Sequence, residues 1–220
     1  FQHENGINKG LKETVLLGLK NATGDWVAFL ESDDVFMPDN LSKKVEIIEK
    51  YPDVRLIFNK VEFLQEGKIN EFQAKIFAEN QKKLFQMKFP KNMFCDLFID
   101  NLLMTFSSVM VEAQALKNAD FNTPKDAILD WWLWVHLAIK NDFYYIDEEL
   151  TSWRLHDKSY IKNGKSVFPI QIRAYGDVYK KNDKPLNLLI FIFCSNIILF
   201  FVRILRFIKR MLIKLFSKKI

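Results

Sequence analysis

Apolar residues in the first 150 positions recur at two spacings, and the two alternate along the chain. Apolar residues three and four positions apart predict amphipathic helices, whereas short continuous or alternating runs predict strands. The helical pattern covers about residues 11–21, 38–51, 92–103 and 130–139, and the strand pattern covers 26–30, 54–64, 104–111 and 143–147. Such alternation predicts an α/β domain.

Two of these segments allow sharper expectations. The helix after Pro38 should turn its apolar residues toward the core, namely Leu41, Val45, Ile47 and Ile48. Glu148 to Leu150 should form a turn after the strand 143–147. The stretch from 69 to 90 is polar and weakly patterned, which favours a surface loop and helix.

A cluster of acids follows the apolar run Trp26 to Leu30. A short continuous run favours a parallel strand covered on both faces, and ligands bind beyond the carboxyl ends of such strands. The acids at that place are Glu31, Asp33 and Asp34. Hard oxygen ligands suit Mg²⁺ or Mn²⁺, which can in turn hold a diphosphate. The alternative is a solvated acidic turn.

The charge is distributed unevenly over the 220 residues. The net charge is +5, yet residues 184–220 hold eight basic residues and no acid, which leaves the remainder at about −3. The acidic body shows no basic stripe or motif typical of nucleic-acid binding. Cys95 and Cys194 have neither disulfide-type nor zinc-type spacing, which fits a reducing, cytosolic setting.

The last 37 residues predict a membrane-associating tail, 184–220, after a domain over 1–183. Residues 186–202 are uncharged but only just long enough for a spanning helix. Residues 203–215 place basic side chains among apolar ones at helical spacing, a pattern typical of helices that lie on anionic lipid. The alternative is a helix docked on a partner subunit.

Three short motifs, in order, resemble family 2 glycosyltransferases, which have the GT-A fold. They are Gly24-Asp25-Trp26, then Leu30-Glu31-Ser32-Asp33-Asp34, then Pro38-Asp39-Asn40-Leu41. The resemblance covers about residues 1–160. It implies a Rossmann-like, mixed and mainly parallel sheet flanked by helices. The family's first strands, which read the nucleotide, are not in this sequence, so we expect the natural protein to extend before Phe1.

The resemblance also implies roles for the acids. Asp33 matches the metal ligand of the family's Asp-x-Asp signature, with Mg²⁺ or Mn²⁺ as the metal. Glu31 replaces the first Asp, and we place Glu31 and Asp34 at the donor diphosphate and sugar. Asp130 matches the general base, although Leu129 stands where the family has Glu. From the residues alone, capping of a helix is the alternative for Asp130.

Later segments carry further matches. The segment Trp153-Arg154-Leu155-His156 resembles the family's Tyr-Arg-x-His, which implies a donor-binding Arg154 and a metal-binding His156. Trp131 and Trp132 are candidates for stacking on the acceptor, with core packing as the alternative. Ser107 and Ser108 match a segment that shapes the acceptor pocket, and bonding to backbone is the alternative. The stretch 69–90 could also contact the acceptor.

The resemblance implies an inverting glycosyltransferase. It would move a sugar from a nucleotide-diphosphate sugar, with UDP-sugars the first expectation, to a glycan or lipid-linked acceptor in polysaccharide biosynthesis. The tail and the family context place it at the cytoplasmic face of a bacterial membrane. Two alternatives stay open: a metal-dependent nucleotidyltransferase, and a non-catalytic membrane-bound glycan-assembly module.

Overall fold

The computed structural model describes residues 6–65, 71–123, 126–155 and Ile197. The chain divides into two compact units, Phe1–Lys165 and Ser166–Ile220. Apart from Ile197, the predicted tail lies outside the described residues. Among the residues that are described, no helix is long and apolar enough to cross a membrane.

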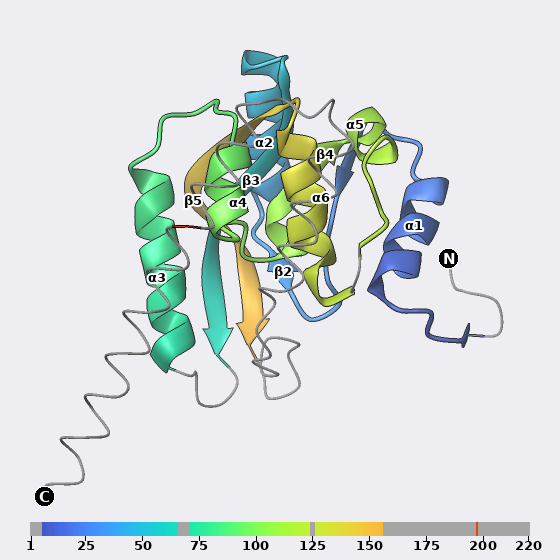
Figure 1. The fold of residues 1–220 in the computed structure, drawn as a ribbon, viewed down its shortest axis with the longest axis horizontal. Coiled ribbons are helices and arrows are strands. Elements are labelled where there is room, and N and C mark those ends of the chain that lie inside the picture. The colour runs from blue at the N-terminus through green and yellow to red at the C-terminus, as the bar shows by residue number, and fades with distance from the viewer. Residues whose placement is uncertain (1–5, 66–70, 124–125, 156–196, 198–220) are drawn as a thin grey trace, which may run out of the picture. The chain divides into compact units, whose positions relative to one another are not determined.

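The first unit is built on one five-stranded sheet with the strand order β1-β4-β3-β5-β2 (Figure 1). The strands are β1 (Trp26–Ala28), β2 (Val35–Phe36), β3 (Val54–Gln65), β4 (Val109–Glu112) and β5 (Asp142–Leu155). The two long strands β3 and β5 are neighbours in the sheet and pair over most of their length. Arg154 of β5 forms hydrogen bonds with the acidic segment that follows β1.

The α/β class and the mixed sheet are confirmed, but the expectation of a mainly parallel sheet is wrong for the described strands. Only β3 and β5 are parallel, and the other three pairings are antiparallel. β4 is antiparallel to both of its neighbours, β1 and β3. β2 pairs with β5 at Thr151 and Ser152, near the C-terminal end of that strand. The connection from β3 to β5 is long, as parallel pairing requires, and it includes β4 as well as helices.

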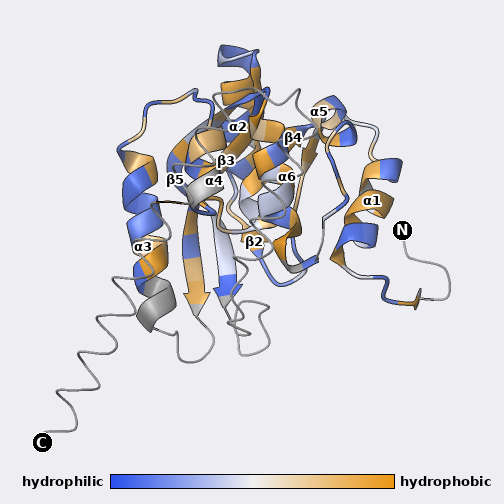
Figure 2. Ribbon diagram, in the orientation of Figure 1, coloured by the Kyte–Doolittle hydropathy of each residue, from blue (hydrophilic) through white to orange (hydrophobic). Residues whose placement is uncertain are grey.

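The helices are α1 (Leu11–Asn21), α2 (Asn40–Lys50), α3 (Glu71–Phe85), α4 (Phe94–Ile99), α5 (Ala113–Lys117) and α6 (Leu129–Ala138). Three of the four predicted helices begin and end close to the expected residues, while α4 is much shorter than predicted. In Figure 2, α1 and α3 carry both hydrophilic and hydrophobic residues. Helix α6 is different, because eight of its ten residues are buried. It is therefore a core helix.

Two predicted segments differ from the observed ones. The predicted strand 104–111 begins with a short 3-10 turn, η2 (Phe106–Ser108), and becomes a strand only at Val109. The predicted turn at Glu148 to Leu150 is part of β5, where the register with β3 shifts. Extra residues in one strand are absorbed there as a bulge, so polar residues mark a bend in the strand rather than its end.

Candidate active site

The acidic segment forms a tight turn between β1 and β2. The Asp34 N–H donates to the Glu31 carbonyl over 3.1 Å, which closes the turn. The Glu31 N–H donates to Ser107 Oγ over 2.9 Å, so η2 fixes the turn from the neighbouring segment. β1 itself is an edge strand paired with β4, and not the parallel strand covered on both faces that the sequence predicts.

Thr105 lies against two of the acids. Its hydroxyl oxygen is 2.7 Å from Glu31 Oε2 and 3.2 Å from Asp34 Oδ2. The side chain of Thr105 is buried. One hydroxyl proton serves one carboxylate at a time, and the shorter distance favours Glu31 as its acceptor.

Asp34 joins the acidic turn to β5 through a hydrogen bond. Its buried carboxylate accepts the backbone N–H of Arg154 over 3.0 Å, through Oδ1. The Arg154 guanidinium donates from Nε to the Asp33 carbonyl over 2.9 Å. The turn and the last part of β5 are therefore joined by two bonds. Arg154 therefore lies at the acidic turn, and its role in binding the donor stays a prediction, while His156 lies outside the described residues.

The negative charges of three other acids in the site act on Glu31. Burial raises the pKa of Glu31 from its ordinary value, the Thr105 hydrogen bond lowers it, and the charges of Asp34, Asp33 and Asp130 raise it further. Asp130 comes from helix α6, nearly a hundred residues further along the chain. The fold thus brings the predicted base and the predicted donor-binding turn into one electrostatic neighbourhood.

Asp130 lies in the first turn of α6, and Ile128 rather than Asp130 is the N-cap residue. Its Oδ2 accepts a hydrogen bond of 2.9 Å from Asn101 Nδ2. Burial raises the pKa of Asp130, and the bonds from backbone N–H groups and from Asn101 oppose that rise. A carboxylate with a raised pKa that remains ionisable has the properties expected of a general base.

Trp131 and Trp132 are core residues in this structure. Trp131 Nε1 donates to the Leu97 carbonyl over 2.7 Å, and Trp132 Nε1 donates to the Asp120 carbonyl over 2.8 Å. Both side chains are buried. Both rings therefore pack in the core, which is the alternative that the sequence left open for them.

A buried polar network supports the turn from beneath. The Thr151 hydroxyl donates to the Ser107 carbonyl over 3.2 Å. It also lies within bonding distance of Asn40 Nδ2 and of Asn59 Nδ2. Asn40 in turn accepts a bond of 2.9 Å from the amine of Lys44, which is fully buried. The network ties α2, β3 and β5 to the segment that holds Glu31.

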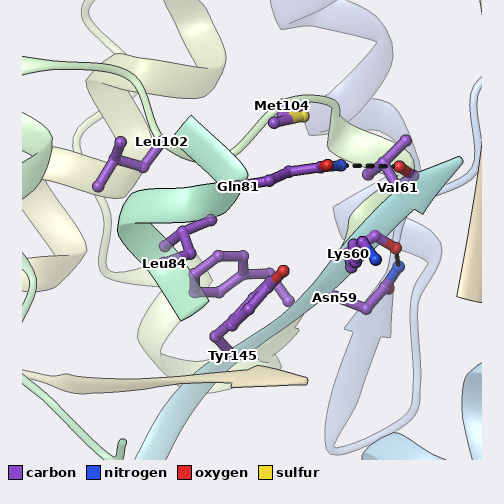
Figure 3. A pocket seen from close by; sticks show the side chains of 9 residues that line it. Asn59, Lys60, Val61, Gln81, Leu84, Leu102, Met104 and Tyr145 are labelled. Atoms are coloured by element: carbon purple, nitrogen blue, oxygen red, sulfur yellow. Dashed lines mark hydrogen bonds between the residues drawn. The ribbon is translucent and has the colours of Figure 1, made fainter. Parts of the chain in front are cut away.

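A narrow pocket lies between β3 and α3 (Figure 3). It encloses about 190 Å³, part of it open to solvent, and Gln81 bridges it by donating to the Val61 carbonyl over 2.9 Å. No acid lines this pocket, so it does not share the carboxylate chemistry of the turn. Its lining residues are Phe58, Asn59, Lys60, Val61, Gln81, Leu84, Leu102, Met104 and Tyr145.

The donor atoms at the turn are of the kind that magnesium prefers. Within the described ranges, no three acid, histidine or cysteine side chains are grouped to hold a metal ion. Magnesium does not require such a group, because it binds through one or two carboxylates, substrate phosphates and water. Asp34 is buried and accepts the Arg154 N–H, whereas Asp33 is half-buried and matches the metal ligand that the sequence resemblance implies.

Sequence reasoning missed Thr105 and Asn101. Thr105 belongs to a segment predicted as a strand, in which only Ser107 and Ser108 stood out as candidates. Those serines instead bond to backbone, because Ser108 Oγ donates to the Thr105 carbonyl and Ser107 Oγ accepts from Glu31. Asn101 lies in the segment predicted as a helix over 92–103, where nothing distinguished it from the other polar residues.

Known proteins match this chain at several levels. The sequence model of glycosyl transferase family 2 matches residues 4–104. An uncharacterized glycosyltransferase of Haemophilus influenzae is 37% identical over 65 residues, 29% of this chain and 22% of that protein. One from Methanocaldococcus jannaschii is 25% identical over 160 residues, 72% of this chain and 51% of that protein. The chain thus spans about half or less of these relatives.

Among solved structures, S. aureus TarS (residues 1–349) in complex with UDP-GlcNAc aligns with a TM-score of 0.55 and 12% identity. The alignment covers 77% of this chain and 47% of that one. At this identity the likeness concerns the fold alone. Residues 4–104 of the chain are therefore similar to glycosyl transferase family 2, and its fold is of the GT-A type.

Proposed function

We propose that this chain transfers a sugar from a nucleotide-diphosphate sugar to a hydroxyl of a glycan or lipid-linked acceptor, with inversion at the anomeric carbon. The observation that carries the proposal is the convergence of Asp130 with the Glu31–Asp34 turn, since the charges of Asp33, Asp34 and Asp130 all act on Glu31. The match of residues 4–104 to glycosyl transferase family 2 makes transfer of a sugar the first chemistry to consider.

Asp130 acts as the general base in this proposal. An acceptor hydroxyl is a weak nucleophile until a positioned carboxylate takes its proton during attack. The new bond joins the acceptor oxygen to the anomeric carbon, while the bond from that carbon to the diphosphate oxygen breaks and its electron pair leaves with the diphosphate. A single displacement of this kind inverts the anomeric centre.

Asp33 and Arg154 face the donor side in the proposal. The oxygen ligands at the turn fit Mg²⁺ or Mn²⁺, with Asp33 as the carboxylate that would hold it. Such a metal supplies positive charge to the leaving diphosphate. Asp34 keeps the loop in place through its bond to the Arg154 N–H. Glu31 is held by the Thr105 hydroxyl, and the charge of Asp130 acts on it.

UDP-sugars are the donors to test first. TarS shares the fold of this chain and binds UDP-GlcNAc. The test uses the full-length protein in detergent or membranes, with UDP-, GDP- and TDP-sugars and either metal, and follows release of nucleoside diphosphate. We expect release that needs metal, Asp33 and Asp130. No release from any donor, without metal-dependent nucleotide binding, would support the non-catalytic module.

The product distinguishes the nucleotidyltransferase alternative. A nucleotidyltransferase would release pyrophosphate, whereas a glycosyltransferase releases a nucleoside diphosphate. Membrane attachment through residues 184–220, at the cytoplasmic face of a bacterial membrane, forms a second part of the proposal. It rests on the basic and apolar pattern of those residues.

A further inference from the structure

We propose that Asn101 is the residue that positions Asp130 and keeps it ionised for its work as a base. The inference rests on the proposed function, because it assigns a partner to the base of that reaction. Asn101 is not itself expected to contact the sugar. It acts through the hydrogen bond of 2.9 Å from its Nδ2 to Asp130 Oδ2.

Asn101 is held firmly enough to position another side chain. It follows α4, and α4 packs against α6, the helix that carries Asp130. Its backbone carbonyl accepts a bond of 3.2 Å from Nδ2 of Asn80, a buried residue on α3. Asn80 therefore fixes the backbone at Asn101, and Asn101 fixes the carboxylate of Asp130.

The electrostatic surroundings of Asp130 require such a donor. Burial disfavours the carboxylate form and raises the pKa of Asp130. This keeps a proton on Asp130, whereas a base must be free of its proton when the acceptor arrives. A hydrogen bond to the charged form counteracts the effect of burial. Asn101 is the side chain that supplies this bond.

The amide oxygen of Asn101 can serve Asp130 after Asp130 has become protonated. Asn101 Oδ1 is buried, and it has no hydrogen-bond partner among the residues that the structure describes. An amide carries a donor and an acceptor on one plane. Once Asp130 has taken the acceptor's proton, a half-turn of the amide presents Oδ1 to the acid's O–H. A neutral amide thus supports both protonation states.

The test is the pH profile of Asn101→Leu, which keeps similar bulk and removes the amide. We expect kcat at pH 7 to fall by about tenfold, and the acid limb of kcat to move up by about one pH unit, because the carboxylate loses its donor. The KM for the donor sugar should stay within about twofold. An acid limb and a kcat equal to wild type would overturn the proposal.

Two further variants keep the result interpretable. Asn101→Asp should move the acid limb in the same direction and further, since it adds a second acid beside Asp130. Asn92→Ala is the matched control, because Asn92 donates to the Ala138 carbonyl at the opposite end of α6. Its pH profile should equal that of wild type. If Asn92→Ala shifts the limb as much as Asn101→Leu does, the effect is merely structural and the proposal fails.

A failure of the Asn101 proposal can be distinguished from a failure of the proposed function by comparing Asp130→Asn with Asn101→Leu. If Asp130→Asn retains full turnover, the assignment of the base is wrong and the inference about Asn101 falls with it. If Asp130→Asn is inactive while Asn101→Leu keeps the wild-type profile, only the positioning role is wrong. Thermal unfolding of each variant shows whether it is folded, and Asn101→Asp provides the answer if Asn101→Leu does not fold.

Discussion

Thr105 places a single hydroxyl against two carboxylates in a buried position. Replacing it with Val keeps the shape and removes the donor, so Glu31 loses the hydrogen bond that lowers its pKa. We expect Thr105→Val to lower kcat/KM by about tenfold and the free energy of unfolding by about 1–3 kcal/mol, because buried acceptors lose their partner. Initial rates and urea unfolding measure the two effects.

Thr105→Ser is the control for that variant. Serine keeps the hydroxyl, so most of the activity should return even though the methyl group is lost. If Thr105→Ser is as impaired as Thr105→Val, packing of the methyl group explains the loss and the hydrogen bonds do not.

Lys44 predicts a dependence of stability on pH. Its amine is fully buried, and desolvation lowers its pKa from 10.5 to about 7. Between these values the unfolded chain holds a proton that the folded chain has lost, so the free energy of unfolding rises with pH, by up to about 1.4 kcal/mol per pH unit. Below about pH 7 both states are protonated, and the full cost of the buried charge remains.

Lys44→Met removes this contribution while keeping a long apolar side chain. We expect the variant to be more stable than wild type at pH 6, and the difference to shrink from pH 7 to pH 9.5. Urea unfolding at those pH values measures it. A difference that is constant across this range would show that Lys44 does not titrate as described.

At single positions, the sequence identifies a candidate functional residue only where the residue belongs to an unusual pattern or motif. The run of acids after an apolar strand indicates the turn, and Arg154 is found from its motif. Thr105, Asn101 and Lys44 carry no such signal, because a Thr, an Asn or a Lys is ordinary at the surface. Only their burial and partners, which depend on tertiary structure, reveal what they do.

The start of α1 is tied to the segment before α6, and Gly10 makes the contact possible. Gly10 has a φ of 90°, and a Cβ there would meet the carboxylate of Asp126, which accepts the Leu11 N–H over 3.0 Å. We expect Gly10→Ala to cost about 1–3 kcal/mol of stability, from backbone strain and this clash. Chemical denaturation measures the loss.

Gly18→Ala is the matched control within the same helix. Gly18 lies in α1, and a Cβ there meets nothing within 4 Å. We expect this variant to be stabilised by about 0.5–1 kcal/mol, from helix propensity alone. Loss of stability in both variants would mean that α1 tolerates no added side chain, and the contact with Asp126 would explain nothing.

At the level of elements, the sequence predicts well where a helix forms. It predicts less well which face of the helix is buried. Helix α2 was expected to bury Leu41 and Val45, but both are exposed, and Asn40 and Lys44 are buried instead. Apolar spacing identifies a helix but not which side meets the sheet when the buried residues are polar. The partners that satisfy Asn40, in particular Thr151, lie over a hundred residues away.

The tail predicts how the whole protein partitions between water and membrane. We expect the full-length protein to sediment with vesicles that contain anionic lipid, and to bind them much less after deletion of residues 184–220. Each basic residue near such a surface contributes about 1 kcal/mol. Changing Arg203, Arg206 and Lys209 to Gln should therefore weaken binding by more than tenfold. Equal binding to neutral and anionic vesicles would contradict an electrostatic contribution.

For the whole molecule, the order of motifs along the chain is sufficient to predict the α/β class and the similarity to family 2 glycosyltransferases. Strand direction cannot be predicted in this way, because β1 is antiparallel to β4 although its apolar run is typical of a parallel strand. A strand's composition depends on how many of its faces are buried. It is therefore a poor guide to orientation in a mixed sheet.

The parallel pair at the centre of the sheet has a consequence for how the chain folds. Each residue of β3 pairs with one roughly 90 positions later, so the strands meet only after a long segment of chain has been closed. Contacts so distant in sequence slow folding, because the entropy of closing the loop is lost before the contacts form. The Glu31 turn and Arg154 are joined across this sheet, so we expect donor binding to appear only with the slowest refolding phase.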